Sequence, residues 1–231
     1  MKKTITILCT LFVAISFSQY RQGYEDTMSG AIYFFNDTAK KGSDQPFVKG
    51  TPYLTEFYNE AEITDYENVN IPALRYNAFK DEMEFERAGE IYYVPKKIGM
   101  VVYLNNLGNK EVYKNLRYLD GNHQNAGFLI EVFNEDGEYS LYKKESVKYV
   151  ESKEAFTSYV SERPAEFVRN KSEFYLVNND FLGKKIPSRR KELLNLFPDD
   201  QDEILEFIKT NKISISKETD LIELVKYLNT L

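Results

Sequence analysis

The single histidine, His123, is the first candidate for chemistry, because an imidazole can act as a general base or as a metal ligand. It lies in a polar run, residues 120–125, whose residue types are typical of a turn. A Ser-His-Asp triad would have to use it, yet the chain has no Gly-x-Ser-x-Gly elbow. A zinc site would need more Cys or His ligands than Cys9 alone supplies. We therefore expect an exposed turn histidine and predict neither a metal site nor a cofactor.

Carboxylates are numerous enough to supply the paired acids of a hydrolase, since the chain has 36 Asp and Glu residues. In one cluster, residues 82–86 (EMEFE), the glutamates alternate with apolar residues, which is typical of the solvated face of a strand. In the other, residues 199–203 (DDQDE), the charges stand where they favour the start of a helix. Neither cluster has the oxygen ligands and glycine of a calcium loop. We expect both to be structural.

Tyrosines supply another candidate site, because the chain has 18 Tyr and 16 Phe but no Trp. Five of them lie on predicted strands, namely Tyr92, Tyr93, Tyr103, Tyr113 and Tyr118. If exposed, such rings stack on sugars or hold an apolar ligand. If buried, they fill a core and leave their hydroxyls at its rim, which is commoner. We take the five as a candidate surface for a ligand or a partner.

Basic residues form one cluster, at Lys184, Lys185, Arg189, Arg190 and Lys191. This cluster is suited to anionic lipid headgroups or to an acidic partner. It is also explained as the charged first turn of an exposed helix, which we favour. The chain as a whole has a formal net charge of −6, and such an acidic protein is a poor candidate for binding nucleic acid.

The elements that position these residues are predicted to be mainly strands. Alternation of apolar and polar residues over 74–78 and 83–86 predicts a hairpin. Short apolar runs separated by Gly, Asn and Pro then recur, which indicates an antiparallel β-meander, either barrel-like or sandwich-like. The predicted strands of the meander cover residues 91–94, 98–104, 112–119, 128–133, 139–142 and 147–150, and an earlier strand is expected at 31–35. Asp136-Gly137 is the best hairpin turn, because both residues tolerate a positive φ.

After about residue 152 the pattern becomes largely helical. We expect a short helix over 153–162, a hairpin from Glu173–Asn178 and Gly183–Ile186, and three C-terminal helices. Ser188 and Ser216 are the predicted N-caps of the first and third helices, and Pro198 opens the second. One apolar face of the last helix must be buried, and it carries Leu221, Leu224, Val225 and Leu228. The predicted fold is α+β, with residues 19–150 forming the antiparallel β region and 151–231 a hairpin and helical tail packed on the sheet in the same domain.

The N-terminus predicts export. Lys2 and Lys3 precede an apolar stretch, residues 5–17, and Ser18 supplies a small residue for cleavage, so residues 1–18 have the pattern of a signal peptide. Cleavage removes Cys9, and the mature chain is then expected to lack disulfides. We expect no transmembrane segment after residue 18, because no later apolar stretch is long enough.

Four segments are notable together: residues 50–54 (GTPYL), 74–79 (LRYNAF), 139–144 (YSLYKK) and the closing run 203–231. They resemble an uncharacterised family of exported proteins from flavobacteria and their relatives, which often have Gln directly after the cleavage point, as Gln19 is here. The resemblance covers most of the mature chain and implies no established activity. It implies a double-membrane envelope. Because the chain ends in an amphipathic helix and not in a β-sandwich sorting signal, periplasmic or outer-membrane-associated residence is expected, more than release.

The expected function is therefore non-catalytic. We predict an exported envelope protein with a binding, carrier or structural role, whose partner is an apolar ligand or an envelope protein. The alternative is a carboxylate-dependent hydrolase of the periplasm, with acids that converge only in the folded chain.

Overall fold

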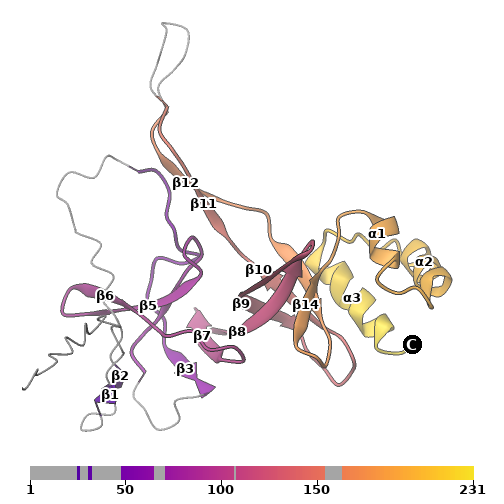
Figure 1. The fold of residues 1–231 in the computed structure, drawn as a ribbon, viewed down its shortest axis with the longest axis horizontal. Coiled ribbons are helices and arrows are strands. Elements are labelled where there is room, and N and C mark those ends of the chain that lie inside the picture. The colour runs from indigo at the N-terminus through magenta and orange to yellow at the C-terminus, as the bar shows by residue number, and fades with distance from the viewer. Residues whose placement is uncertain (1–24, 27–30, 33–47, 65–70, 107, 154–162) are drawn as a thin grey trace, which may run out of the picture.

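The structure is a computed structural model, which describes residues 25–26, 31–32, 48–64, 71–106, 108–153 and 163–231. The expected signal peptide and the expected helix after residue 153 lie outside the described residues, as does most of the strand expected at 31–35. β1 (Glu25–Asp26) and β2 (Ala31–Ile32) form a small separate pair. Strands dominate the remaining chain and three helices follow at its end (Figure 1), so the predicted α+β class with an antiparallel sheet is confirmed.

A small five-stranded barrel forms the centre of the molecule. Its strands are β8 (Asn109–Asp120), β9 (His123–Phe133), β10 (Ser140–Lys144), β13 (Glu173–Val177) and β14 (Leu182–Lys185). Each strand pairs antiparallel with the next, and β14 closes the ring by pairing parallel with β8. The interior is filled by Leu116, Tyr118, Leu129, Tyr142, Tyr175 and Val177. Of the predicted meander, the strands at 112–119, 128–133 and 139–142 therefore lie in a barrel, which the separately predicted hairpin of β13 and β14 completes. The predicted strands at 91–94 and 147–150 lie outside the barrel, as β6 and β11.

The long strand β8 belongs to two parts of the sheet. Its first half pairs with β7 (Val101–Asn106), and residues 117–119 pair with β14. Beyond β7 the sheet ends at β3 (Ala61–Ile63). A strand that serves both neighbours must be long, which explains its twelve residues.

A second, three-stranded sheet lies beside the barrel and consists of β4 (Arg75–Asn77), β5 (Glu82–Arg87) and β6 (Glu90–Tyr93). It contains the hairpin that the alternation predicts. Apolar residues of this sheet and of β7 share one hydrophobic core with residues of β8 and β9. The core contains Leu74, Tyr76, Met83, Phe85, Met100, Val102, Tyr113 and Phe128.

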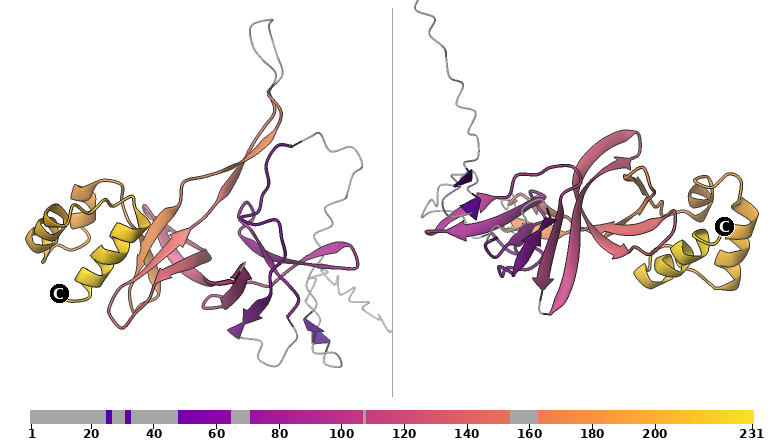
Figure 2. Two further views of the ribbon diagram at one scale, coloured as in Figure 1. Left: turned by 180° about the vertical axis from the view of Figure 1, so that it is seen from behind. Right: turned by 90° about the horizontal axis from the view of Figure 1, so that it is seen from below.

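Between β10 and β13 the chain leaves the barrel as a two-stranded ribbon. The ribbon consists of β11 (Val147–Val150) and β12 (Glu166–Arg169), paired antiparallel, with a further bridge between Lys153 and Arg163. It projects from the body in Figure 1 and in the left view of Figure 2.

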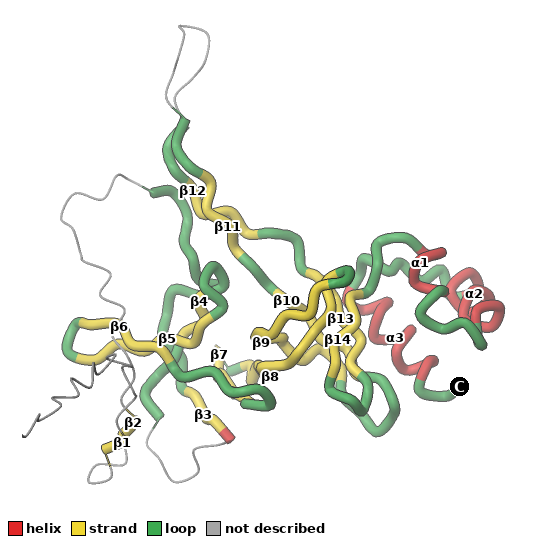
Figure 3. Tube along the Cα trace, in the orientation of Figure 1, coloured by secondary structure: helices red, strands yellow, loops and turns green. Residues whose placement is uncertain are grey.

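The three helices follow β14 and lie together at one end of the molecule (Figure 3). They are α1 (Arg190–Leu194), α2 (Gln201–Thr210) and α3 (Glu218–Leu228). All four apolar residues of the predicted α3 face are buried, in a cluster that also contains Leu141 of β10 and Leu176 of β13. Among the described residues, none of the helices has the length and apolar character needed to cross a bilayer.

The predicted helix caps are wrong. The N-cap of α1 is Arg189 and that of α3 is Lys217, and neither side chain makes a capping hydrogen bond. At α3 the carboxylate of Asp220 accepts a hydrogen bond from the Ser214 N–H (2.9 Å), and this holds the preceding turn. This contact does not replace an N-cap, because Ser214 lies before the helix and its N–H is not one of the free N–H groups of the first turn.

We expected Gly137 to take a positive φ in a hairpin turn. This prediction is also wrong, because the φ of Gly137 is not positive. A Cβ at this position would collide with the side chain of Asn229, which follows α3. Asn229 accepts a hydrogen bond from the Tyr139 N–H (2.8 Å) and donates one to the Tyr139 carbonyl (2.9 Å). Gly137 is therefore required by the close approach of the helical tail to the β9–β10 connection.

If the apolar face of α3 stabilises the fold, Leu224→Asp should lower the free energy of unfolding by about 4 kcal/mol, because it buries an unpaired charge. The matched control is Glu223→Gln on the exposed side of the same helix. Thermal and urea unfolding measure the change. Equal melting of the two variants would show that the tail adds nothing to the stability of the barrel.

Candidate functional site

The turn between β4 and β5 carries a carboxylate with an unusual number of partners, Asp81. Its Oδ1 accepts hydrogen bonds from the Tyr76 hydroxyl (2.6 Å), the Phe128 N–H (3.2 Å) and the Lys144 ammonium (3.2 Å). Its Oδ2 accepts one from the Lys96 ammonium (3.0 Å). Three of the four donors thus contact Oδ1 and one contacts Oδ2. We call this cluster of Asp81, Tyr76, Lys96 and Lys144 the Asp81 latch.

The latch joins the three-stranded sheet to the barrel. Asp81 has a φ of 58°, a left-handed conformation that Asp tolerates better than most residues. It can reach β9 because Gly127 has no side chain, since a Cβ there would collide with the Asp81 carboxylate. The barrel strand thus has a gap into which the carboxylate fits. Because each of these donors comes from the chain itself and ties the turn to a neighbouring segment, we interpret this arrangement as structural.

The glutamates of residues 82–86 were predicted to be solvated. This prediction is wrong for Glu84, which is only 1% exposed. Its Oε2 accepts hydrogen bonds from Nε and Nη2 of Arg75 (3.2 Å each), and its Oε1 accepts one from Asn77 (2.7 Å). Met83 and Phe85 are buried as well, so β5 is covered on both faces. The second cover comes from residues 53–59, which bridge to β4 and to Leu74.

Two tyrosines from that cover enclose Arg75. The guanidinium carbon lies 3.7 Å from the ring centroid of Tyr53 and 4.4 Å from that of Tyr58. The Tyr53 hydroxyl accepts a hydrogen bond from Arg75 Nη2 (2.6 Å), and burial raises the pKa of both phenols. Arg75 and Glu84 thus neutralise one another within a mostly closed site, which explains how a carboxylate lies in the core.

The other predicted chemical residues have ordinary surroundings. His123 is exposed, as predicted, at the first position of β9 opposite Asp120. Asp202 and Glu203 lie in the first turn of α2, as the helix-start interpretation predicts. Within the described ranges, no group of three or more His, Cys, Asp or Glu side chains is arranged to hold a metal ion.

The structure does not gather the five predicted tyrosines on one surface. Tyr113 is 1% exposed and packs against Tyr76 (ring centroids 5.2 Å apart), in the core below the three-stranded sheet. Tyr118 is 8% exposed and packs against Tyr175 (5.1 Å) inside the barrel.

Three of the five are partly exposed, Tyr92 and Tyr93 on β6 and Tyr103 on β7. Tyr92 stacks on Phe85 with ring centroids 5.4 Å apart. The Tyr93 hydroxyl accepts a hydrogen bond from Lys80 (2.8 Å). Tyr103 lies beside Lys110 on the outer sheet. A ligand-binding role for the five stays a prediction.

Exposed aromatic residues do gather elsewhere, at the base of the ribbon. Tyr149 and Phe167 face one another across β11 and β12, with ring centroids 5.3 Å apart. Phe79 packs edge-on against Phe167 at 5.4 Å. Phe79 is 44% exposed and Tyr149 41% exposed. We call these three residues the ribbon-base aromatic surface. It could not be found from the sequence, because Phe79 lies about seventy positions from Tyr149 and joins it only in the folded chain.

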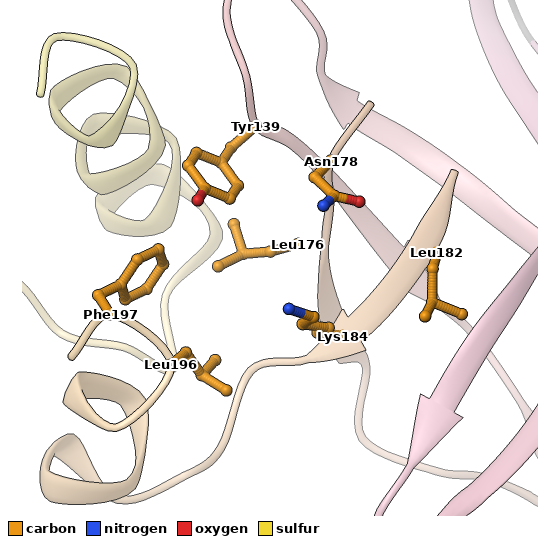
Figure 4. A pocket seen from close by; sticks show the side chains of 7 residues that line it. All are labelled: Tyr139, Leu176, Asn178, Leu182, Lys184, Leu196 and Phe197. Carbon is orange, nitrogen blue, oxygen red and sulfur yellow. The ribbon is translucent and has the colours of Figure 1, made fainter. Parts of the chain in front are cut away.

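The described residues form a pocket between the barrel and α1 (Figure 4), which is lined by Tyr139, Leu176, Asn178, Leu182, Lys184, Leu196 and Phe197. Its volume is about 40 Å³. Another pocket, of about 230 Å³, has a polar lining from β3 and the β7–β8 hairpin that includes Glu60, Glu62, Tyr103 and Lys110. Both are smaller than the roughly 300–1,000 Å³ of typical ligand sites.

In comparisons with protein-family models, with curated proteins and with solved structures, nothing matches this chain.

The first prediction from this site concerns the Asp81 latch. Asp81→Ala should lower the free energy of unfolding by about 2–3 kcal/mol, because it leaves two ammonium groups and a backbone N–H without their acceptor. Asp81→Asn should cost less, since Asn keeps the shape and tolerates the positive φ. The exposed Asp136→Ala serves as control. If Asp81→Ala melts like the control in urea titrations, the latch does not hold the two sheets together.

The buried tyrosines predict alkaline unfolding. Burial raises the pKa of both Tyr118 and Tyr142 from 10.0 to about 12. The unfolded chain therefore ionises first, so the stability from these groups is complete below pH 10 and is lost as the pH rises toward 12. Tyrosinate absorbance and circular dichroism should change together in this window. Gradual ionisation with unchanged circular dichroism would contradict the prediction, and Tyr149→Phe should leave the transition in place.

Proposed function

We propose that the mature chain is a non-catalytic binding protein of the cell envelope, exported through a cleaved signal peptide and retained in the periplasm or at the outer membrane. The observation that carries the binding role is the ribbon-base aromatic surface. Large apolar side chains that are exposed next to one another mark interaction sites more often than single exposed residues do. Here Phe79, Tyr149 and Phe167 come from three separate segments and meet on one surface.

The ribbon itself supports a partner protein. Beyond its base it has only two strands, and two-stranded ribbons are marginal in water unless they pack on another element. Lys49 adds a short contact on the β12 side, where its N–H donates to Ala165 (2.9 Å) and its carbonyl accepts from Phe167 (2.8 Å). A partner laid along the ribbon would bury the aromatic rings and supply further packing.

The surroundings of Asp81 and Glu84 support binding over the hydrolase alternative. Donors from the chain itself contact both oxygens of each carboxylate. A general acid or base needs an oxygen that is free to exchange a proton with substrate.

Cross-linked affinity capture from the native envelope tests this proposal. We expect the tagged protein to retain a defined partner, and the double substitution Phe79→Ser with Tyr149→Ser to reduce recovery at least tenfold by removing both exposed rings.

The control is Phe57→Ser, since Phe57 is 77% exposed and belongs to no aromatic pair of the described residues. Far-ultraviolet circular dichroism of each variant checks that the fold is kept. Equal recovery from the double variant and the wild type would place the binding surface elsewhere. A capture that stays empty after cross-linking would argue against a binding role.

A further inference from the structure

The turn between β13 and β14 holds a phenylalanine in a conformation that phenylalanine rarely adopts. Phe181 has a φ of 56°, and its N–H donates a hydrogen bond to the Asn178 carbonyl (3.0 Å) to close the turn. Glycine or asparagine is the usual residue at such a position. The Phe181 residue is 70% exposed, so its ring gains little packing in return. A strained backbone that bears an exposed aromatic ring is a feature expected where a protein makes contact with something else.

A pocket lies next to this turn. The pocket of Figure 4 is lined by Asn178 and Leu182, which flank the turn on both sides, and by Leu196 and Phe197 after α1. Its volume of about 40 Å³ is too small for a separate ligand but suits the edge of an inserted ring. The exposed Phe181 therefore belongs to a turn whose neighbouring residues line a pocket, and we treat the turn and the pocket as one patch.

The patch also carries charges of opposite sign. Asp180 precedes Phe181 and is exposed, and Lys184 extends into the lining of the pocket. In the part of the chain that the structure describes, the Lys184 ammonium has no ion pair or hydrogen bond, unlike that of Lys185, which contacts Glu173 (2.6 Å). The two lysines of the predicted basic cluster thus differ, because Lys185 is paired within the chain and Lys184 is available to a carboxylate of another molecule.

We propose that this patch binds a second copy of the chain about a two-fold axis. A two-fold interface must be self-complementary, because each feature meets its counterpart from the same surface. Here Phe181 of one copy enters the pocket of the other, and Asp180 of one copy pairs with Lys184 of the other. An anionic lipid surface fits less well, because the Asp180 carboxylate stands at the tip that would enter it. The inference is independent of the proposed function, since the ribbon-base aromatic surface belongs to other elements.

Sedimentation of the purified mature protein over a wide range of concentration is the first test. We expect a monomer–dimer equilibrium, and Phe181→Asn should raise the dissociation constant at least tenfold by removing the central ring. The same change should raise the melting temperature of the monomer, since asparagine tolerates the positive φ. Lys212→Asn is the matched control, because Lys212 is exposed and has a φ of 54° after α2. It should raise the melting temperature without changing the dissociation constant.

Charge exchange tests the pairing itself. Asp180→Lys and Lys184→Asp should each weaken the dimer at least tenfold, and the double variant should restore it, because both contacts are then re-formed with reversed charge. A protein that stays monomeric at every concentration overturns the proposal. So does a dimer that is insensitive to Phe181→Asn, or a double variant that is as weak as the single ones. A monomer that binds phosphatidylglycerol vesicles through Phe181 would also overturn it and identify lipid as the occupant.

Discussion

The contact of Asp81 with the barrel is the interaction on which the arrangement of this protein depends. The three-stranded sheet and the barrel are formed by different stretches of the chain, and this carboxylate ties the turn of the first to strand β9 of the second. Two lysines, a tyrosine hydroxyl and a backbone N–H converge on it, so moving the sheet would leave several polar groups unpaired. Gly127 makes the approach possible because any side chain there would fill the same space. One structural unit therefore combines the turn at Asp81 with Gly127 of a distant strand and with the ammonium groups of Lys96 and Lys144.

Among the described residues, three hydrophobic clusters are found: one below the three-stranded sheet, one inside the barrel and one among the helices. β8 links the first two because its halves belong to different pairings, and Leu141 and Leu176 of the barrel share the third cluster with the helices. Phe167 of the ribbon-base aromatic surface packs against the first cluster. The pocket next to the Phe181 turn is lined by Leu176 and Phe197 of the third cluster.

Much of the local structure was predictable from the sequence, because period-two and helical patterns report which side of an element is apolar. The hairpin of β4 and β5, the strands of the meander, the hairpin of β13 and β14, and the buried face of α3 all follow from such patterns. Neither the capping residues nor the reason for Gly137 was predictable. Neither α1 nor α3 uses a side-chain cap at its N-cap residue. Gly137 depends on the contact of Asn229 with the β9–β10 connection, which a local pattern does not contain.

The sequence by itself determined the α+β class, the antiparallel strands and the exposure of His123, since each depends on residues close together in the chain. Only the tertiary structure decided that the meander closes as a barrel, because closure requires β14 to pair with β8, about sixty-five positions earlier. It also decided that Glu84 is buried. Alternation shows that a strand has two faces, but whether the second face meets water depends on what covers it. Here the cover is a segment some thirty residues away, which brings Tyr53 and Tyr58. They enclose Arg75 of β4, which pairs with Glu84 and makes the buried carboxylate tolerable.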